Sequence, residues 1–142
     1  MRPDGTPEGA RRSMDNCLKL LNGKKHIDIF EYARVDKNVP IETTLKILEE
    51  EYVKTGKLGG IALSEVSAAT IEKAAKATKI VAVEVELSLW STDIFQNGVA
   101  EACAKFGIPV VAYVSPATFP YPQSLIGRQL LTYRPWNVVW RN

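Results

Sequence analysis

The chain has 142 residues, of which 46% are hydrophobic and 24% are charged, and its 18 basic and 16 acidic residues leave a net charge of +2. This size and composition indicate one folded domain or a piece of a larger one. The balanced charge argues against nucleic acid as a partner, and the lack of a long apolar run argues against a membrane-spanning segment.

The first half of the chain predicts two amphipathic helices separated by a strand. Thr6 can cap the first helix, which Gly23 ends. Residues 27–32 are predicted to form a strand, and a second helix follows from Pro40 to Gly56. The apolar residues at helical spacing are Ala10, Met14, Cys17, Leu18 and Leu21 in the first helix, and Ile41, Leu45, Leu48 and Tyr52 in the second.

The second half of the chain repeats this alternation. Ser67 can cap a third helix, and Thr92 or Asp93 can cap a fourth, which Gly107 ends. Further strands are predicted at residues 58–63, 80–87 and 108–113. Strands joined by helical crossovers run parallel, so we expect an α/β fold in which about four parallel strands alternate with helices. The pattern fits either a doubly wound sheet or half of a β/α barrel.

The last part of the chain, residues 114–142, breaks the pattern. Residues 114–123 contain three prolines and show no periodicity, which predicts an extended loop, and the tail beyond them predicts no clear element. No Gly-x-Gly-x-x-Gly or Walker-type sequence follows any predicted strand, so the chain lacks the glycine-rich turns that bind phosphates.

Cysteine and histidine content bears on compartment and on metal chemistry. Residues 1–5 have no apolar core of a signal peptide, so we expect a cytoplasmic protein with reduced thiols. Cys17 and Cys103 fit no zinc-binding spacing and are predicted to be buried. His26, the only histidine, is predicted to lie exposed in a loop. The sequence therefore predicts no metal site and no histidine-based triad.

Charged residues interrupt the predicted strand at residues 80–87. Side chains alternate along a strand, so the valines at positions 81, 83 and 85 share a face predicted to pack under helices. Ala82, Glu84 and Glu86 share the other face. Ligands of parallel α/β proteins bind outside the carboxyl ends of the strands, which makes the two glutamates candidate ligand-binding residues. They are also consistent with solvated or salt-bridged rim residues.

A carboxylate pair raises a second possibility, a glycoside hydrolase. The acids of such enzymes flank the scissile bond, whereas Glu84 and Glu86 point the same way from one strand. We therefore rank this possibility below the others.

Four segments of the chain, taken in order, resemble the aldo-keto reductases. They are residues 27–36, 60–67, 82–89 and 108–113, which resemble the fourth, fifth, sixth and seventh strands of that family. The ending Ala33-Arg34-Val35-Asp36 and the following residues 39–44 are most similar to the fungal pyridoxal reductases. The resemblance covers residues 4–113.

The resemblance implies a partial (β/α)₈ TIM-type barrel over residues 1–113, followed by an irregular insertion and tail over residues 114–142. It implies a reductase that uses NADPH and transfers hydride to an aldehyde such as pyridoxal, giving the alcohol. A tyrosine assisted by a lysine supplies the proton in this family, and the protein positions the cofactor.

Five residues stand at cofactor-binding positions of the family. Ser64 and Glu65 stand beside the nicotinamide amide, and Glu84 stands where a glutamine commonly holds that amide. A carboxylate can accept a hydrogen bond from the amide nitrogen but cannot donate one unless it is protonated. Tyr113 stands where an aromatic ring stacks on the nicotinamide, although it also fits a strand-end core residue. Ser124 stands where the family pattern resumes after residues 114–123.

Departures from the family bear on activity. The family's catalytic Asp, Tyr and Lys belong to the first three strand regions, upstream of the residues matched here. Ala33 stands at the position of the catalytic histidine, as in the fungal subgroup. The resemblance therefore predicts no catalytic residue in this chain. The alternative to a reductase is a catalytically dead half-barrel that binds a partner, or a non-functional gene fragment, with residues 114–123 as a translated intron or other insertion.

Half a barrel has a physical cost that a closed barrel avoids. It leaves two open strand edges, and we expect one sheet face to be exposed and apolar. The chain is then predicted to be marginally stable or prone to aggregate, unless another chain covers its edges.

Overall fold

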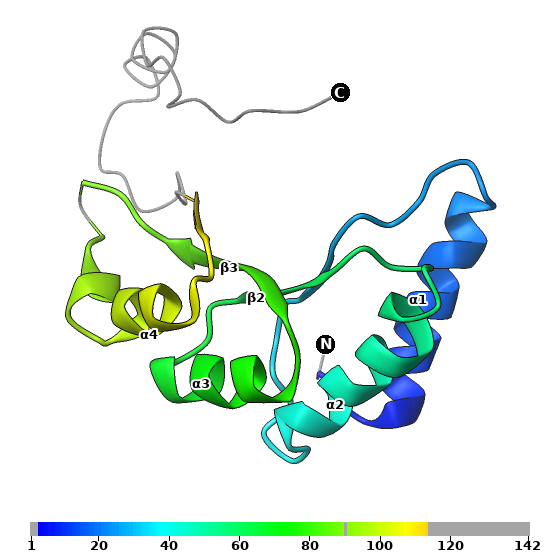
Figure 1. Ribbon diagram of the computed structural model, residues 1–142, viewed down its shortest axis with the longest axis horizontal. Coiled ribbons are helices and arrows are strands. Elements are labelled where there is room, and N and C mark those ends of the chain that lie inside the picture. Colours follow the sequence, from blue (N-terminus) through cyan, green and yellow to red (C-terminus); the bar gives the residue numbers. More distant parts are fainter. Residues whose placement is uncertain (1–2, 90, 114–142) are drawn as a thin grey trace, which may run out of the picture.

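The computed structural model describes residues 3–89 and 91–113, in which four parallel strands form one sheet (Figure 1). The strands are β1 (Phe30–Tyr32), β2 (Ile61–Ser64), β3 (Ile80–Glu86) and β4 (Val110–Tyr113), and their order in the sheet is their order in the sequence. Every neighbouring pair is parallel. The prediction of four parallel strands alternating with helices is confirmed.

Helices connect the strands and lie against one face of the sheet (Figure 1). They are α1 (Pro7–Leu21), α2 (Ile41–Leu48) with a π-helical extension η1 (Glu49–Val53), α3 (Ala68–Ala77), a 3-10 turn η2 (Asp93–Phe95) and α4 (Val99–Phe106). None of the helices in the described part of the chain combines the length and the apolar character that a membrane span requires.

The helix caps follow the sequence closely at two positions. The Thr6 hydroxyl accepts a hydrogen bond from the Gly9 amide at 3.1 Å, and the Ser67 hydroxyl accepts one from the Thr70 amide at 3.3 Å. Both side chains satisfy an amide that the first helical turn leaves unpaired. The end of α1 differs by one residue from the prediction, because Asn22 takes the left-handed cap conformation at a φ of 48° ahead of Gly23.

The start of the fourth helix was predicted wrongly. Thr92 precedes and Asp93 begins only the short turn η2, and α4 begins at Val99 after Gly98. Gly98 has a φ of 81°, which turns the chain out of the path of η2 and sets a new helix direction. The first strand is also shorter than predicted, because Ile27 pairs only with Leu58 in an isolated bridge.

The register of β2 and β3 contains an irregularity. Ile61 faces Ile80, but the next residue, Ala62, faces Ala82, so Val81 has no partner in β2. An unpaired extra residue in a strand shifts the side-chain alternation beyond it. As a result, two core residues of β3 on opposite sides of the irregularity, Ile80 and Val83, face the same helices.

This irregularity corrects the predicted valine face. Val83 and Val85 are buried among the helices, at 0% and 3% exposure, but Val81 is only half-buried and lies outside the core. The Val81 side chain sits against Gly60, where an added Cβ would lie 2.6 Å from Val81 Cγ1. Gly60 therefore supplies the space that the displaced valine occupies.

The core forms where the helices meet the sheet. Its fully buried side chains include Met14, Leu45, Leu48, Ile61, Leu63, Ile71, Val83 and Cys103. Cys103 is buried as predicted, whereas Cys17 is only half-buried, which corrects that prediction. His26 is exposed in its loop, as predicted.

The face of the sheet away from the helices is polar rather than apolar. The strand registers place Glu31, Ala62, Ser64, Ala82, Glu84, Glu86, Val111 and Tyr113 on this face, so charged and polar side chains interrupt its apolar ones. Among the exposed large hydrophobic side chains of the described residues, only Val111, at 46% exposure, lies in a strand. The expectation of an exposed apolar sheet face was therefore wrong, because charged and small residues occupy it.

Candidate functional site

Four of the predicted site residues meet at the carboxyl ends of three neighbouring strands. Ser64 ends β2 and lies opposite Glu84 of β3, and Glu65 follows Ser64 directly. Tyr113 ends β4 and lies opposite Glu86 of β3. The parallel strands bring these residues to one end of the sheet. Ser124, together with the predicted insertion and tail, lies outside the described residues.

Ser64 and Glu84 share the uncovered face with a residue that the sequence did not single out. Glu31, in β1, lies on the same face of the sheet, and its side chain interacts with those of Glu84 and Ser64. Ser64 is 7% exposed, and the two glutamates are half-buried. Burial, followed by the adjacent Glu84, raises the pKa of Glu31 above its usual range. The signal for Glu31 was present, because it is a charged residue between Phe30 and Tyr32 in a strand.

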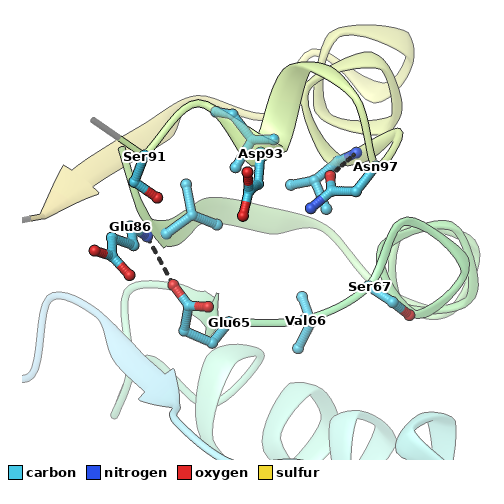
Figure 2. Close-up of a pocket in the computed structure, with 10 residues that line it drawn as sticks. Glu65, Val66, Ser67, Glu86, Ser91, Asp93 and Asn97 are labelled. Carbon is cyan, nitrogen blue, oxygen red and sulfur yellow. Dashed lines mark hydrogen bonds between the residues drawn. The ribbon is translucent and has the colours of Figure 1, made fainter. Parts of the chain in front are cut away.

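Glu65 ties three strand ends together. Its carboxylate accepts a hydrogen bond from the Glu86 amide at 2.7 Å, which Figure 2 shows as a dashed line. The same carboxylate lies beside the Tyr113 hydroxyl, and its interaction with that hydroxyl, followed by burial, raises the pKa of Tyr113 above its ordinary value. The Glu65 amide donates to the Glu84 carbonyl oxygen at 3.0 Å.

The backbone of Glu65 is strained. Its φ is 51°, a left-handed conformation that residues other than glycine and asparagine rarely adopt. Such strain persists where surrounding interactions hold it, and here the Glu86 amide and the Tyr113 hydroxyl do so.

A cleft of about 310 Å³ opens beside this cluster. Figure 2 shows Glu65, Glu86 and Asp93 around it, with Ser91 on the segment after β3. Asn97 also lines the cleft, and its side-chain oxygen accepts a hydrogen bond from the Val99 amide at 3.1 Å. Of the predicted cofactor-binding residues that the structure describes, only Glu65 lines this cleft; the sequence did not single out Asp93 of η2 or Asn97, before α4, as site residues.

Two residues after β1 complete the surroundings. Ala33 is exposed, and its methyl side chain can neither donate nor accept a proton. The Arg34 guanidinium donates a hydrogen bond to the Ala33 carbonyl oxygen at 2.6 Å. Its positive charge lowers the pKa of Glu31 and of Tyr113, in each case against larger opposing effects. Arg34 is therefore the cation that acts on both sides of the site.

The donor set of this site fits a planar ring that carries an amide. A buried hydroxyl, at Ser64, and a carboxyl, at Glu84, can hydrogen-bond an amide, while the half-buried Tyr113 ring offers an aromatic surface. Within residues 3–89 and 91–113, no group of three or more His, Cys, Asp and Glu side chains can hold a metal ion. Glu84 and Glu86 come from one strand, which does not suit a glycosidase.

Comparison with known families gives one match over most of the chain. Residues 1–118 match the family described as "Aldo/keto reductase family". A curated Schizosaccharomyces pombe protein named "Probable pyridoxal reductase 2" is 45% identical over 113 residues. The alignment covers 80% of this chain and 34% of that protein, so the chain spans about a third of the relative's length.

Solved structures of similar shape are also aldo-keto reductases. A thermostable aldo-keto reductase crystallised with the inhibitor epalrestat has a TM-score of 0.71 and 26% identity, over 89% of this chain and 46% of that one. The glycerol dehydrogenase of Gluconobacter oxydans has a TM-score of 0.70 over 85% of this chain and 39% of that one; at 18% identity it supports the fold alone. The predicted partial (β/α)₈ barrel is confirmed.

Proposed function

The chain belongs to the aldo/keto reductase family, and from this premise we propose that it forms the nicotinamide-binding part of an NADPH-dependent reductase. The observation that carries the proposal is the meeting of Ser64, Glu84 and Tyr113 at the carboxyl end of the sheet. Ligands of β/α barrels bind at this end.

Each of these residues has a role in the proposal. Ser64 and Glu84 hydrogen-bond the carboxamide of the nicotinamide, and the Tyr113 ring packs on its face. Glu65 holds Tyr113 in place through its hydroxyl and ties it to the backbone of Glu86. When bound, NADPH supplies a hydride to a carbonyl carbon. The residues of this chain hold and orient the ring for that transfer.

We propose an aldehyde such as pyridoxal as the substrate, because a 45% identical relative carries that name. The transfer also requires a proton at the carbonyl oxygen, and Ala33 cannot supply it. The proton donor must therefore come from residues that complete the barrel. Since β1 and β4 each pair on one side only within the described residues, we propose that these edges receive the rest of the barrel or a second chain.

NADPH binding to the purified chain tests the proposal. Energy transfer from protein tryptophan to nicotinamide reports binding, and circular dichroism on the same sample reports folding. We expect saturable binding that weakens about fivefold to tenfold in Tyr113→Ala and in Ser64→Ala. Glu101→Gln, an exposed change on α4, is the matched control and should bind like the wild type.

Failure of a folded chain to bind NADPH would contradict the proposal. The alternative, a dead half-barrel that acts through a partner or a fragment without function, would then describe the chain better.

A further inference from the structure

The sheet face that the helices leave uncovered carries three glutamates. The strand registers place Glu31 of β1 there, together with Glu84 and Glu86 of β3, while the helices pack on the opposite face (Figure 1). The other residues that the registers place on this face are neutral, so none of them pairs with a glutamate as a cation would. All three glutamates are half-buried. Anything that covers this face must therefore pair or neutralise their charges.

The part of a barrel that this sector lacks is about as large as the sector itself. The described residues form four parallel strands, and the chain covers 46% and 39% of the two solved structures compared above. A barrel of eight strands is just wide enough for side chains to fill its interior. Within the described residues, β1 and β4 each pair on one side only. A polypeptide that completes the barrel must therefore pair with both edges and cover the acidic face.

A second copy of the chain has a suitable number of strands but the wrong charge. Two copies related by a twofold axis could pair β4 of each with β1 of the other, which would close the sheet. Each copy would then add its three glutamates to those of the other, in the interior of one barrel. Arg34, after β1, acts on one glutamate of each set, Glu31. Burial of the remaining like charges without partners strongly disfavours this dimer.

We propose that the acidic face binds a β/α polypeptide of different sequence, which pairs with the edges of β1 and β4 and presents lysine or arginine to Glu31, Glu84 and Glu86. This inference rests on the proposed function, in which other residues complete the barrel. Hydrogen bonds between a basic side chain and a carboxylate are among the strongest in proteins. The same glutamates repel a second copy, so they select the partner as well as bind it.

A charge-reversed copy of this chain supplies the partner chemistry for a test. The full chain is made with Glu31→Lys, Glu84→Lys and Glu86→Lys together, and circular dichroism checks that it folds. Sedimentation equilibrium measures the mass of the wild type, of the variant and of an equimolar mixture of the two. We expect each protein alone to remain a monomer, and the mixture to form a one-to-one dimer at least about tenfold more tightly than either alone.

Net charge alone cannot produce this result. The wild type carries a net charge of +2, and each of the three substitutions adds two charges, so the variant carries +8 and the two proteins repel each other overall. The matched control makes the same change at three exposed helix positions, Glu8, Glu42 and Glu101. A mixture of this control with the wild type should remain monomeric, because its added charges lie away from the acidic face.

A neutral variant keeps the test decisive if the lysine variant does not fold. Glu31→Gln, Glu84→Gln and Glu86→Gln together remove the repulsion between copies without reversing any charge. We expect this variant to dimerise at least about tenfold more tightly than the wild type. Equal and weak self-association of the two folded proteins would show that the glutamates do not exclude a second copy, which would overturn the inference.

The remaining outcomes identify other occupants. A wild-type dimer as tight as the mixed dimer would overturn the inference, because a second copy would then cover the face. A mixture of folded proteins that stays monomeric would also overturn it. Residues 114–142, which hold three arginines and no acidic residue, would then be the occupant to test. These measurements use no NADPH, so a failure here is distinct from a failure of the proposed nicotinamide binding.

Discussion

Glu65 shows how one side chain can fix the geometry of a strand-end cluster. Its carboxylate contacts the Glu86 amide and the Tyr113 hydroxyl, which belong to two further strands. The same residue holds an unfavourable left-handed backbone. A shorter side chain could not reach both partners from this turn, which gives a physical reason for glutamate at the position.

Replacing the Glu65 carboxylate should change the chemistry of Tyr113. We expect Glu65→Gln to lower the pKa of Tyr113 towards its ordinary value, because the negative charge and the acceptor that favour the neutral phenol are removed. Carbon-13 NMR of labelled tyrosine rings measures this directly. The signals of the individual tyrosines must be resolved, because burial and Asp15 raise the pKa of Tyr52 to about 12.

Glu101→Gln controls for a general charge effect on that titration. An unchanged pKa of Tyr113 in Glu65→Gln would mean that the contact with Glu65 does not stabilise the neutral phenol.

The strand pattern singled out Glu84 and Glu86, and the family resemblance added Ser64, Glu65 and Tyr113, but neither gave all of their partners. The alternation of residues 80–87 separates Glu84 and Glu86 from the valines, and parallel pairing brings them to Ser64 and Tyr113. Glu31 and Arg34 were missed, because a charged residue in or after a strand does not by itself reveal its neighbours: the register of β1 on β2 places Glu31 beside the site, and Arg34 follows the same strand.

Elements were predicted well where the determining forces are local. Amphipathic spacing and capping residues set the starts of α1 and α3 to the residue, since caps satisfy amides within one turn. The π-helical segment from Glu49 to Val53 was not predicted. Its Tyr52 is 3% exposed and its hydroxyl donates to Asp15 of α1 at 2.9 Å. Helical periodicity predicts that Tyr52 faces the core, but it does not reveal the change from α-helical to π-helical geometry.

The irregular pairing of β2 and β3 predicts a strict size limit at Gly60. An alanine Cβ there would lie 2.6 Å from Val81 Cγ1 and 3.1 Å from Cγ2. The stiff, β-branched valine cannot easily turn away. We expect Gly60→Ala to destabilise the fold by about 1–3 kcal/mol, measured by urea unfolding.

The double variant Gly60→Ala with Val81→Ala is the matched test of that cause. It removes the two methyl groups that meet the new Cβ and should recover most of the loss. Equal stability of Gly60→Ala and the wild type would show that the two strands can separate without cost.

At the scale of the whole molecule, the chain is a sector of a barrel with a polar inner face. Glu31, Glu84 and Glu86 on that face interact with water more favourably than an apolar face would, which removes one reason to expect aggregation. The two edge strands, β1 and β4, can still pair with another chain. Because β1 has three residues and β4 has four, each offers only a short template for such pairing.

The same view predicts little chemistry from this chain alone. We expect the purified chain to oxidise no NADPH with pyridoxal above the rate without protein, because the methyl group of Ala33 cannot donate a proton to the carbonyl oxygen. Absorbance at the nicotinamide band measures the rate. Clear turnover by the pure chain would show that a proton donor exists within it.

The sequential strand order has a consequence for how this sector forms. Helices also pack in chain order, α1 on α2, α2 on α3 and α3 on α4. Each strand–helix unit therefore docks on the one made just before it, and few loops must close over long separations in sequence. As the chain leaves the ribosome, each unit meets the surface of the unit made before it, so this sector can assemble stepwise during translation.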